Sequence, residues 1–155
     1  MTDKELNVVL REMARGQGLC DSWYSKWSDD DTIDECLDRF VRGFDFCVEH
    51  DYPNLDFILR NFRKEDLHRH NIFVDEEIDL CFDGSGYIVC LGDCRGHIEL
   101  RGLVAVTVYL RHTSSVEVTA SDGARVFITR YDESECYCIG DELSTVKVYD
   151  RTSIK

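Results

Sequence analysis

The sequence predicts an α+β protein, in which an N-terminal helical cap is followed by a short β-solenoid with two strands per turn. Apolar residues recur at helical spacing up to residue 70, and after Val74 they alternate as they do in strands. The strand-like runs also repeat with a nearly constant period, which is typical of repeat architectures. We therefore assign a helical cap to residues 1–74, a β-solenoid to 75–150 and a tail to 151–155.

The helical half begins with two short amphipathic segments. Apolar side chains lie on one face of a helix between Glu5 and Arg15. Trp23 and Trp27 are four residues apart, the spacing of neighbours on a helix surface. We expect these two rings to anchor a second short helix in the core.

A longer helix should follow. Thr32 and Glu35 have the spacing of a capping box, which predicts that this helix begins at Thr32. It should end near His50, ahead of the single proline, because the residue before a proline avoids the helical conformation. Asn54 then starts another short helix, and residues 65–70 add a final turn.

Beyond Val74 the chain contains a triplet with two apolar ends about every ten residues. Eight such triplets start at residues 78, 88, 98, 106, 116, 126, 136 and 146. Every second triplet belongs to the same family, with steps of 20, 18 and 20 residues in one family and 18, 20 and 20 in the other. Such self-similarity predicts stacked turns, each too thin to bury its apolar ends alone.

An antiparallel β-sandwich is the alternative fold, because many short strands at regular spacing also fit that class. The turn residues Ser121, Asp122 and Gly123 could close a hairpin instead of a solenoid corner. We favour the solenoid because alternate strands resemble each other more than consecutive strands do. A solenoid leaves its last strand, Thr145 to Tyr149, open to pairing, so we expect the tail or a second copy to cover it, which makes a homodimer through this end one expectation.

The composition narrows the possible partners and compartment. The 18 basic and 31 acidic side chains leave a net charge of −13. This charge argues against direct nucleic-acid binding, because contacts to phosphate require Lys and Arg. The sequence contains no apolar run long enough to span a membrane, and residues 1–5 do not resemble a secretory signal. We therefore expect a cytoplasmic protein whose 8 cysteines are reduced thiols.

Neither cysteine pattern matches a structural zinc site. Cys90, Cys94 and His97 form one cluster, and Cys136 with Cys138 form another, but both lack the usual pairs of Cys-x2-Cys elements. We interpret Cys90, Cys136 and Cys138 as small core residues, because they occupy strand positions that elsewhere hold Val or Ile. No cofactor or metal is expected.

Catalytic motifs are also lacking, so we do not expect an enzyme. The sequence has no P-loop, no nucleophile elbow and no dinucleotide-binding glycine motif. The nearest arrangement is Cys94, expected at an exposed corner, with His97 or His112 as the base. A thiol or metal enzyme therefore remains only an alternative.

The middle residue of each triplet should point outward. On one face these residues are Asp79, Glu99, Glu117 and Tyr137. Strands stack about 4.8 Å apart, so the three carboxylates would form a ladder. Such a ladder is a solvated face, a calcium site or an imitation of a phosphate backbone, and the last possibility gives our second function: an acidic inhibitor that binds a basic protein.

The opposite face is more apolar than a solvated surface should be. Its candidate docking residues are Val89, Tyr109, Phe127 and Tyr149. Exposed apolar patches usually mark a contact surface, which could be filled by the chain's own helices or by another protein. A separate basic cluster lies between Arg60 and His70 and is interrupted by acidic residues. We interpret it as a solvated helix end, with a contact for phosphate or an acidic partner as the alternative.

Four segments support a resemblance to a known group. Asp-Lys-Glu-Leu-Asn at 3–7, Gly-Leu-Cys at 18–20, Arg-Gly-Phe-Asp-Phe-Cys at 42–47 and Tyr-Leu-Arg-His-Thr-Ser at 109–114 resemble small uncharacterised proteins of gut Bacteroidales and their mobile elements or phages. This resemblance implies a cytosolic bacterial or phage protein and no particular activity. Our prediction from the sequence is a non-enzymatic module that binds a protein partner.

Overall fold

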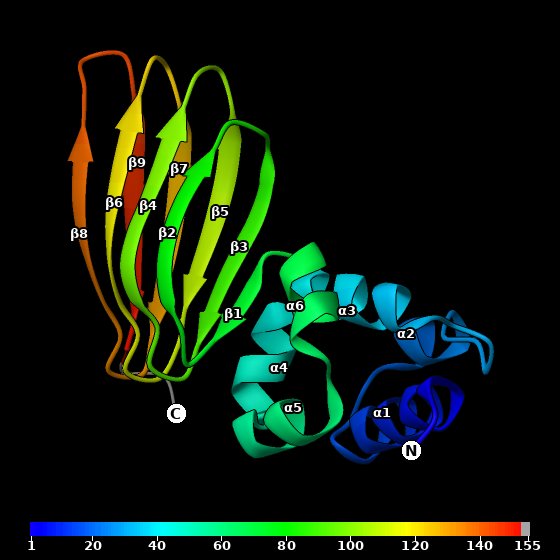
Figure 1. The fold of residues 1–155 in the computed structure, drawn as a ribbon. Coiled ribbons are helices and arrows are strands. Elements are labelled where there is room, and N and C mark those ends of the chain that lie inside the picture. Colours follow the sequence, from blue (N-terminus) through cyan, green and yellow to red (C-terminus); the bar gives the residue numbers. More distant parts are fainter. Residues whose placement is uncertain (153–155) are drawn as a thin grey trace. The chain divides into compact units, whose positions relative to one another are not determined.

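The computed structural model describes residues 1–152 and divides the chain into a helical unit and a β-unit (Figure 1). The helical unit comprises residues 1–70, and the β-unit begins at Asn71. Within the described residues, six helices precede nine strands, so the predicted α+β class is confirmed. Among the described residues, no helix combines the length and the apolar character that crossing a membrane requires.

The helical unit contains two helices where the sequence predicted one long helix, and Gly43 lies between them. Its helices are α1 (Asp3–Gly16), α2 (Asp21–Ser25), α3 (Ile33–Arg42), α4 (Phe44–His50), α5 (Leu55–Asn61) and α6 (Lys64–Arg69). The single long helix expected from Thr32 to near His50 is therefore two helices. Gly43 separates them, because glycine is a poor helix former and here serves as the C-cap of α3 and the N-cap of α4.

The predicted caps are confirmed. The Thr32 hydroxyl accepts the Glu35 amide at 3.2 Å, and the Glu35 carboxylate accepts the Thr32 amide at 3.3 Å, so both arms of the capping box are formed. Asn54 caps α5 by accepting the Phe57 amide at 2.9 Å. These local contacts fix where α3 and α5 begin.

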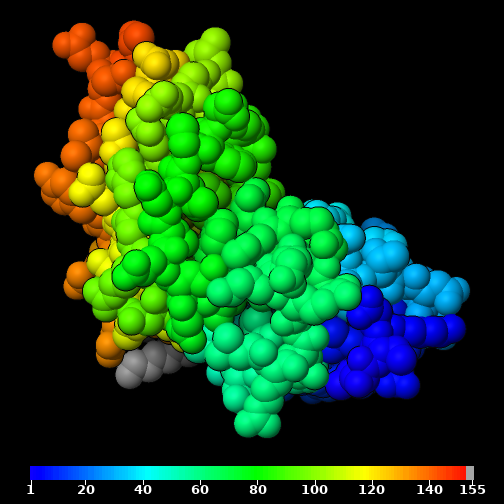
Figure 2. Space-filling view, viewed as in Figure 1, coloured from blue at the N-terminus to red at the C-terminus, as the bar shows by residue number. Residues whose placement is uncertain are grey.

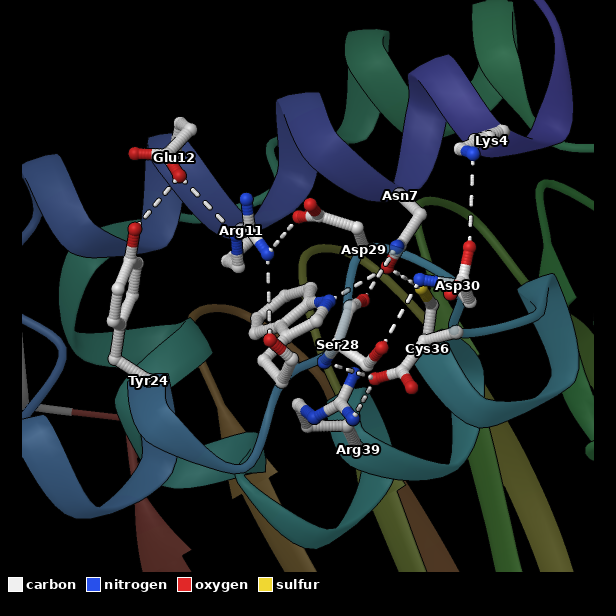
Figure 3. A network of polar contacts seen from close by, with 12 residues as sticks. Lys4, Asn7, Arg11, Glu12, Tyr24, Ser28, Asp29, Asp30, Cys36 and Arg39 are labelled. Atoms are coloured by element: carbon white, nitrogen blue, oxygen red, sulfur yellow. Dashed lines mark hydrogen bonds and ion pairs between the residues drawn. The ribbon is translucent and has the colours of Figure 1, made fainter.

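A buried asparagine ties the connection before α3 to α1 (Figure 3). The Asn7 side-chain oxygen accepts the Trp27 indole N–H at 2.6 Å and the Cys36 thiol at 3.1 Å. The Asn7 amide nitrogen donates to the Ser28 carbonyl at 2.9 Å. Asn7 is fully buried, so these bonds replace the water that it loses on folding.

Trp27, and not Trp23, is the aromatic anchor of this unit. α2 ends at Ser25, so the two rings are not partners on one helix as expected. Trp27 is buried, whereas Trp23 is partly exposed. The Arg39 guanidinium lies 4.2 Å from the centroid of the Trp27 ring and pairs with Asp31 at 2.6 Å. Stacking and ion pairing together hold this charged side chain against the core.

The β-unit is the predicted solenoid. Its strands are β1 (Ile72–Val74), β2 (Glu77–Phe82), β3 (Gly86–Leu91), β4 (Arg95–Arg101), β5 (Ala105–Leu110), β6 (Ser115–Ser121), β7 (Arg125–Tyr131), β8 (Glu135–Gly140) and β9 (Thr145–Arg151). Odd-numbered strands form a five-stranded sheet and even-numbered strands form a four-stranded sheet. Every pairing is parallel and joins a strand to the strand two ahead of it. The antiparallel sandwich is therefore excluded for the described chain.

The first strand lies outside the predicted boundary. Ile72 to Val74 were assigned to the helical cap, but they form β1 and pair with Val89 to Leu91. All three residues of β1 are buried, so the segment lacks the alternation that marks a half-buried strand. The boundary between the units consequently falls after His70 and not at Val74.

The solenoid core lies between the two sheets and consists of stacked rows of similar side chains. Val106, Val126 and Val146 form one row through direct pairing of β5, β7 and β9. The row of Val108 and Ile128 is fully buried, as is Ile98 on the facing sheet. Each turn contributes few apolar side chains, and these become buried only because successive turns stack. Figure 2 shows the stacked turns as successive bands of colour across the β-unit.

The corners repeat as regularly as the strands. Asp75, Gly92, His112 and Asp132 each have a positive φ at the corner that follows a strand of the five-stranded sheet. The amide of His112 donates to the Asp132 carboxylate at 2.9 Å, and the amide of Gly92 donates to His112 Nδ1 at 2.9 Å. Side chains of one turn therefore satisfy the backbone of the turn beside it.

We predict that Asn7→Leu destabilises the helical unit by about 2–3 kcal/mol, because it leaves the indole N–H of the buried Trp27 without its partner and removes the bond to the Ser28 carbonyl. Both tryptophans of the chain lie in this unit, so urea unfolding followed by tryptophan fluorescence reports its stability. The control is Asn61→Leu, since Asn61 is only partly buried and donates within its own helix. Equal losses for the two variants would contradict the proposed importance of the Asn7 network.

We also predict that Gly96→Ala destabilises the solenoid by at least about 2 kcal/mol. Gly96 has a φ of +144°, and a Cβ there would lie 1.9 Å from the Ile78 carbonyl oxygen. Gly84→Ala is the matched control, since a Cβ at Gly84 meets nothing within 4 Å. Thermal unfolding followed by the β-sheet circular dichroism signal measures both, and a Gly96→Ala protein as stable as the Gly84→Ala protein would refute the β2–β4 register.

Candidate functional site on the outer faces of the solenoid

Each sheet presents one face to the core and one face outward. We call the outward side of β2, β4, β6 and β8 the acidic face, and the outward side of β3, β5, β7 and β9 the aromatic face. Successive side chains of a strand alternate between the two sides of its sheet. The predicted candidates Asp79, Glu99, Glu117 and Tyr137 lie on the acidic face, and Val89, Tyr109, Phe127 and Tyr149 lie on the aromatic face.

The expected ladder of three carboxylates is not formed. Asp79 pairs with His97, His97 pairs with Glu117, and Glu117 pairs with Tyr137. Glu99 lies in the neighbouring row, between Cys81 and Thr119. The expected alignment was wrong because β4 is displaced by two residues from the triplet alignment, which places Gly96 and not Ile98 beside Ile78.

A two-residue displacement leaves the inward pattern unchanged, and this explains the error. A shift of one residue would turn every apolar side chain of β4 outward, whereas a shift of two keeps it inward. Residues 96–100 contain apolar side chains at both Ile98 and Leu100, so the pattern itself fits either alignment. The same displacement in the other sheet places Tyr109, and not Thr107, beside Val89.

Opposite charges and polar groups break up the acidic face. The Glu99 carboxylate pairs with Arg101 at 2.8 Å. His97 Nε2 lies 2.8 Å from the Thr119 hydroxyl and 3.8 Å from the Glu117 carboxylate. Among the described residues, no group of three or more His, Cys, Asp or Glu side chains is arranged to hold a metal ion. The acidic face therefore has mixed character and differs from the regular charge spacing of a phosphate backbone.

Aromatic rings form a connected line across the aromatic face. Tyr87 is stacked on Tyr109, with ring centroids 6.2 Å apart and an interplanar angle of 12°. Tyr109 in turn lies 6.5 Å from the Tyr131 ring. Tyr87 and Tyr149 are 41% and 49% exposed, so their rings are accessible at the surface.

The remaining candidates on this face differ in accessibility. Phe127 and Tyr109 are half-buried in the strands that carry them. Val89 is fully buried, although it points away from the solenoid core, so it offers no accessible surface. The apolar docking face inferred from the sequence is thus reduced to its aromatic members.

The charges on the aromatic face were missed in the sequence. Among the described residues, the outward positions of β3, β5, β7 and β9 include no Asp or Glu. Arg125 and Lys147 extend the β5–β7–β9 rows, and Arg151 lies at the end of β9. A chain with a net charge of −13 therefore has one face of rings and cations. The alternation of the strands could have revealed this segregation, because every second residue belongs to this face.

The basic cluster of the helical unit is engaged in ion pairs. Arg63 and Arg69 both bind the buried Asp66, at 2.8 Å and 2.6 Å. His70 Nε2 lies 2.8 Å from the Asp34 carboxylate, which Arg69 also contacts, and the pKa of Asp34 is lowered by its hydrogen bonds to His70 and Arg69. These contacts fit the interpretation of a solvated helix end.

The Cys94 thiol is fully buried, contrary to its expected exposure at a corner. Its Sγ donates to the carbonyls of Phe73 and Leu91, both at 3.3 Å. A hydrogen bond with the Cys90 thiol outweighs burial and lowers the pKa of Cys94 to about 7. His97 and His112 are engaged by other residues, so the proposed Cys–His arrangement is not assembled.

The other cysteines follow the predicted packing. Cys90 is fully buried in the solenoid core, and Cys136 and Cys138 pack against it with their sulfurs 3.9 Å apart. Burial raises the pKa of Cys138 to about 12, which keeps this thiol protonated at neutral pH. These are the properties of small core residues.

Alkylation should distinguish the buried thiols from the exposed ones. Cys20 and Cys81 are exposed, and we predict that iodoacetamide modifies them in the folded, reduced protein. Cys94 should react at least about a hundredfold more slowly despite its lowered pKa, since reagent reaches it only when the strands open. Peptide mass spectrometry over time measures each rate, and rapid selective modification of Cys94 would contradict this prediction and support the thiol-enzyme alternative.

Comparisons with known proteins assign the chain to no family. No family model, no curated protein and no solved structure matches this chain.

Proposed function

We propose that this protein is a non-enzymatic interaction module whose protein partner docks on the aromatic face. The observation that carries the proposal is the segregation of exposed rings and cations, without carboxylates, on one side of a stacked sheet in a strongly acidic chain. Tyrosine, phenylalanine and arginine are the side chains enriched at protein interfaces.

The backbone beneath the aromatic face is already ordered, so binding a partner there should cost little conformational entropy. Each strand of β3, β5 and β7 is hydrogen-bonded on both sides in the five-stranded sheet, so the rings project from a backbone that is already fixed. Tyr87 and Tyr109 also fix each other by stacking. Surfaces ordered in advance lose less conformational entropy on binding.

The charge of the face defines the chemistry of the partner. Arg125 and Lys147 lie beside the half-buried Phe127 ring, and Arg151 extends the cationic edge. A partner surface that presents carboxylates around an apolar centre complements this arrangement. Because the overall charge of the chain is negative, attraction to such a partner depends on the local field of this face and weakens with salt.

The acidic-inhibitor alternative has weaker support. It requires a carboxylate array on the acidic face, but His97 stands between Asp79 and Glu117, and Arg101 neutralises Glu99. We therefore place the partner on the aromatic face and use the acidic face as the internal control.

The test uses matched substitutions on the two faces. A partner cross-linked and captured from the native host is purified, and its affinity for each variant is measured by calorimetry. Arg125→Glu should weaken binding roughly tenfold or more, whereas the same reversal at Arg95, which is exposed on β4 of the acidic face, should change it less than about twofold.

A second pair isolates the contribution of the rings. Tyr87→Ala should weaken binding, and Tyr137→Ala, which removes an exposed ring from the acidic face, should not. Loss of affinity with Arg95→Glu and Tyr137→Ala, but not with their counterparts, would place the partner on the acidic face and refute the proposal.

A further inference from the structure

The last turn of the solenoid leaves two strands open. Within the described chain, β8 pairs only with β6, and β9 pairs only with β7. The outer edges of β8 and β9 therefore present backbone N–H and C=O groups with no strand beside them. Open edges of this kind are sites where another chain can add a strand.

The core is also unfinished at this end. Val148 pairs with the fully buried Ile128, yet Val148 is 44% exposed. Cys138 pairs with the fully buried Val118 and is only partly buried itself. Side chains that complete the core in every inner turn thus lie at the surface in the last one.

Charges protect the edges of β8 and β9 only in part. Proline, bulges and charged side chains, especially lysine, protect sheet edges from pairing. β9 carries Lys147 on its outward side and Asp150 at its last inward position. The inward residues in the middle of both strands are apolar: Cys136, Cys138, Val146 and Val148.

A second copy of this end fits both edges at once. β8 and β9 run in opposite directions, as their arrows show (Figure 1). A twofold axis that lies in the plane of the last turn and runs parallel to its strands places β8 of one copy beside β9 of the other, antiparallel, and the symmetric pair forms at the same time. A single added strand from another protein would satisfy only one of the two edges.

The inward apolar residues determine the register of this pairing. Residues directly opposite each other in an antiparallel pair lie on the same side of the sheet, so the inward residues of β8 must face the inward residues of β9. The register that pairs all four apolar ones places Cys138 opposite Val146 of the second copy and Cys136 opposite Val148 of the second copy. All four inward apolar positions are then paired with one another.

The same register brings opposite charges together. Glu133, at the corner before β8, lies opposite Arg151 of the second copy, and the outward Tyr137 lies opposite Lys147 of the second copy. Opposite charges and ring–cation neighbours across strands are favourable pairs. No inward carboxylate is placed against the apolar positions.

We infer that two copies of this protein join through their last turns, with β8 and β9 of one copy pairing antiparallel with β9 and β8 of the other. The two solenoid cores become continuous across the twofold axis. The part of the aromatic face on β3, β5 and β7 stays outside this contact, whereas Lys147 and Arg151 of β9 border both surfaces.

Sedimentation velocity on the full chain tests the inference. The reduced protein at about 100 µM should sediment as a dimer, with twice the 18.0 kDa mass of the chain. Val148→Lys should be monomeric at that concentration, because it places a charge in the middle of the contact. Leu103→Lys, at an exposed corner residue of an inner turn, makes the same change outside the contact and should leave the dimer intact.

Each outcome has a definite meaning. A monomeric wild-type protein overturns the inference, and protected β8 and β9 amides in that monomer would identify the chain's own C-terminal residues as the cover. A dimer that survives Val148→Lys places the contact elsewhere and also overturns it. Loss of the dimer in both lysine variants would overturn the proposed location, because Leu103 lies outside it.

A cross-link provides a second test if Val148→Lys does not fold. In Val148→Cys, mild oxidation should join residue 148 to Cys136 of the second copy and produce a covalent dimer on a non-reducing gel. Adding Cys136→Ser should abolish that product. Failure of the single variant to cross-link, or cross-linking that persists without Cys136, would contradict the register.

Discussion

The fold of the β-unit depends on one constraint: a turn of two short strands cannot enclose its own apolar side chains. Each turn contributes only a few inward residues, such as Val106, Val108 and the facing Ile98. They become fully buried because the next turn lies directly beside them and repeats the same pattern. Parallel pairing between alternate strands and corners with stacked positive-φ residues both follow from this need to stack.

The same constraint separates the outer surface into two chemically different faces. Because every odd strand lies in one sheet and every even strand in the other, residues 20 apart gather on one side. Rings and cations such as Tyr109 and Arg125 therefore line one sheet, while Glu99 and Glu117 lie on the other. A preference for rings and cations at the outward positions of each odd-numbered strand therefore produces an extended aromatic face. This is why we place partner binding on the aromatic face. The same constraint affects the last described turn: among the described residues no further turn packs beside it, and Val148 is exposed.

Much of this organisation was predictable from the sequence because it rests on local or periodic patterns. The capping box at Thr32 and the cap at Asn54 involve residues three positions apart, and the alternate-strand families show the stacking. The register was not predictable from alternation, because a displacement by two residues keeps Ile98 inward. Because of that displacement, His97 lies between Asp79 and Glu117 on the acidic face, where Glu99 was expected.

Features that depend on distant contacts were missed for a different reason. The partners of Asn7 are 20 or more residues away, so no local pattern marks it as a buried hub. β1 consists of three buried residues without alternation, and the burial of Cys94 depends on carbonyls supplied by Phe73 and Leu91. Gly43 is a further case, because the apolar pattern of α3 continues into α4 across the break.

The most direct test of the stacked architecture is a set of backbone proton contacts measured by nuclear magnetic resonance. Parallel pairing of alternate strands predicts amide-to-Hα contacts between neighbours of Val108 and Ile128, and between neighbours of Val118 and Cys138. Contacts that instead connect Val118 with Val126, as a hairpin closed at Asp122 would produce, would contradict the solenoid and the two faces derived from it.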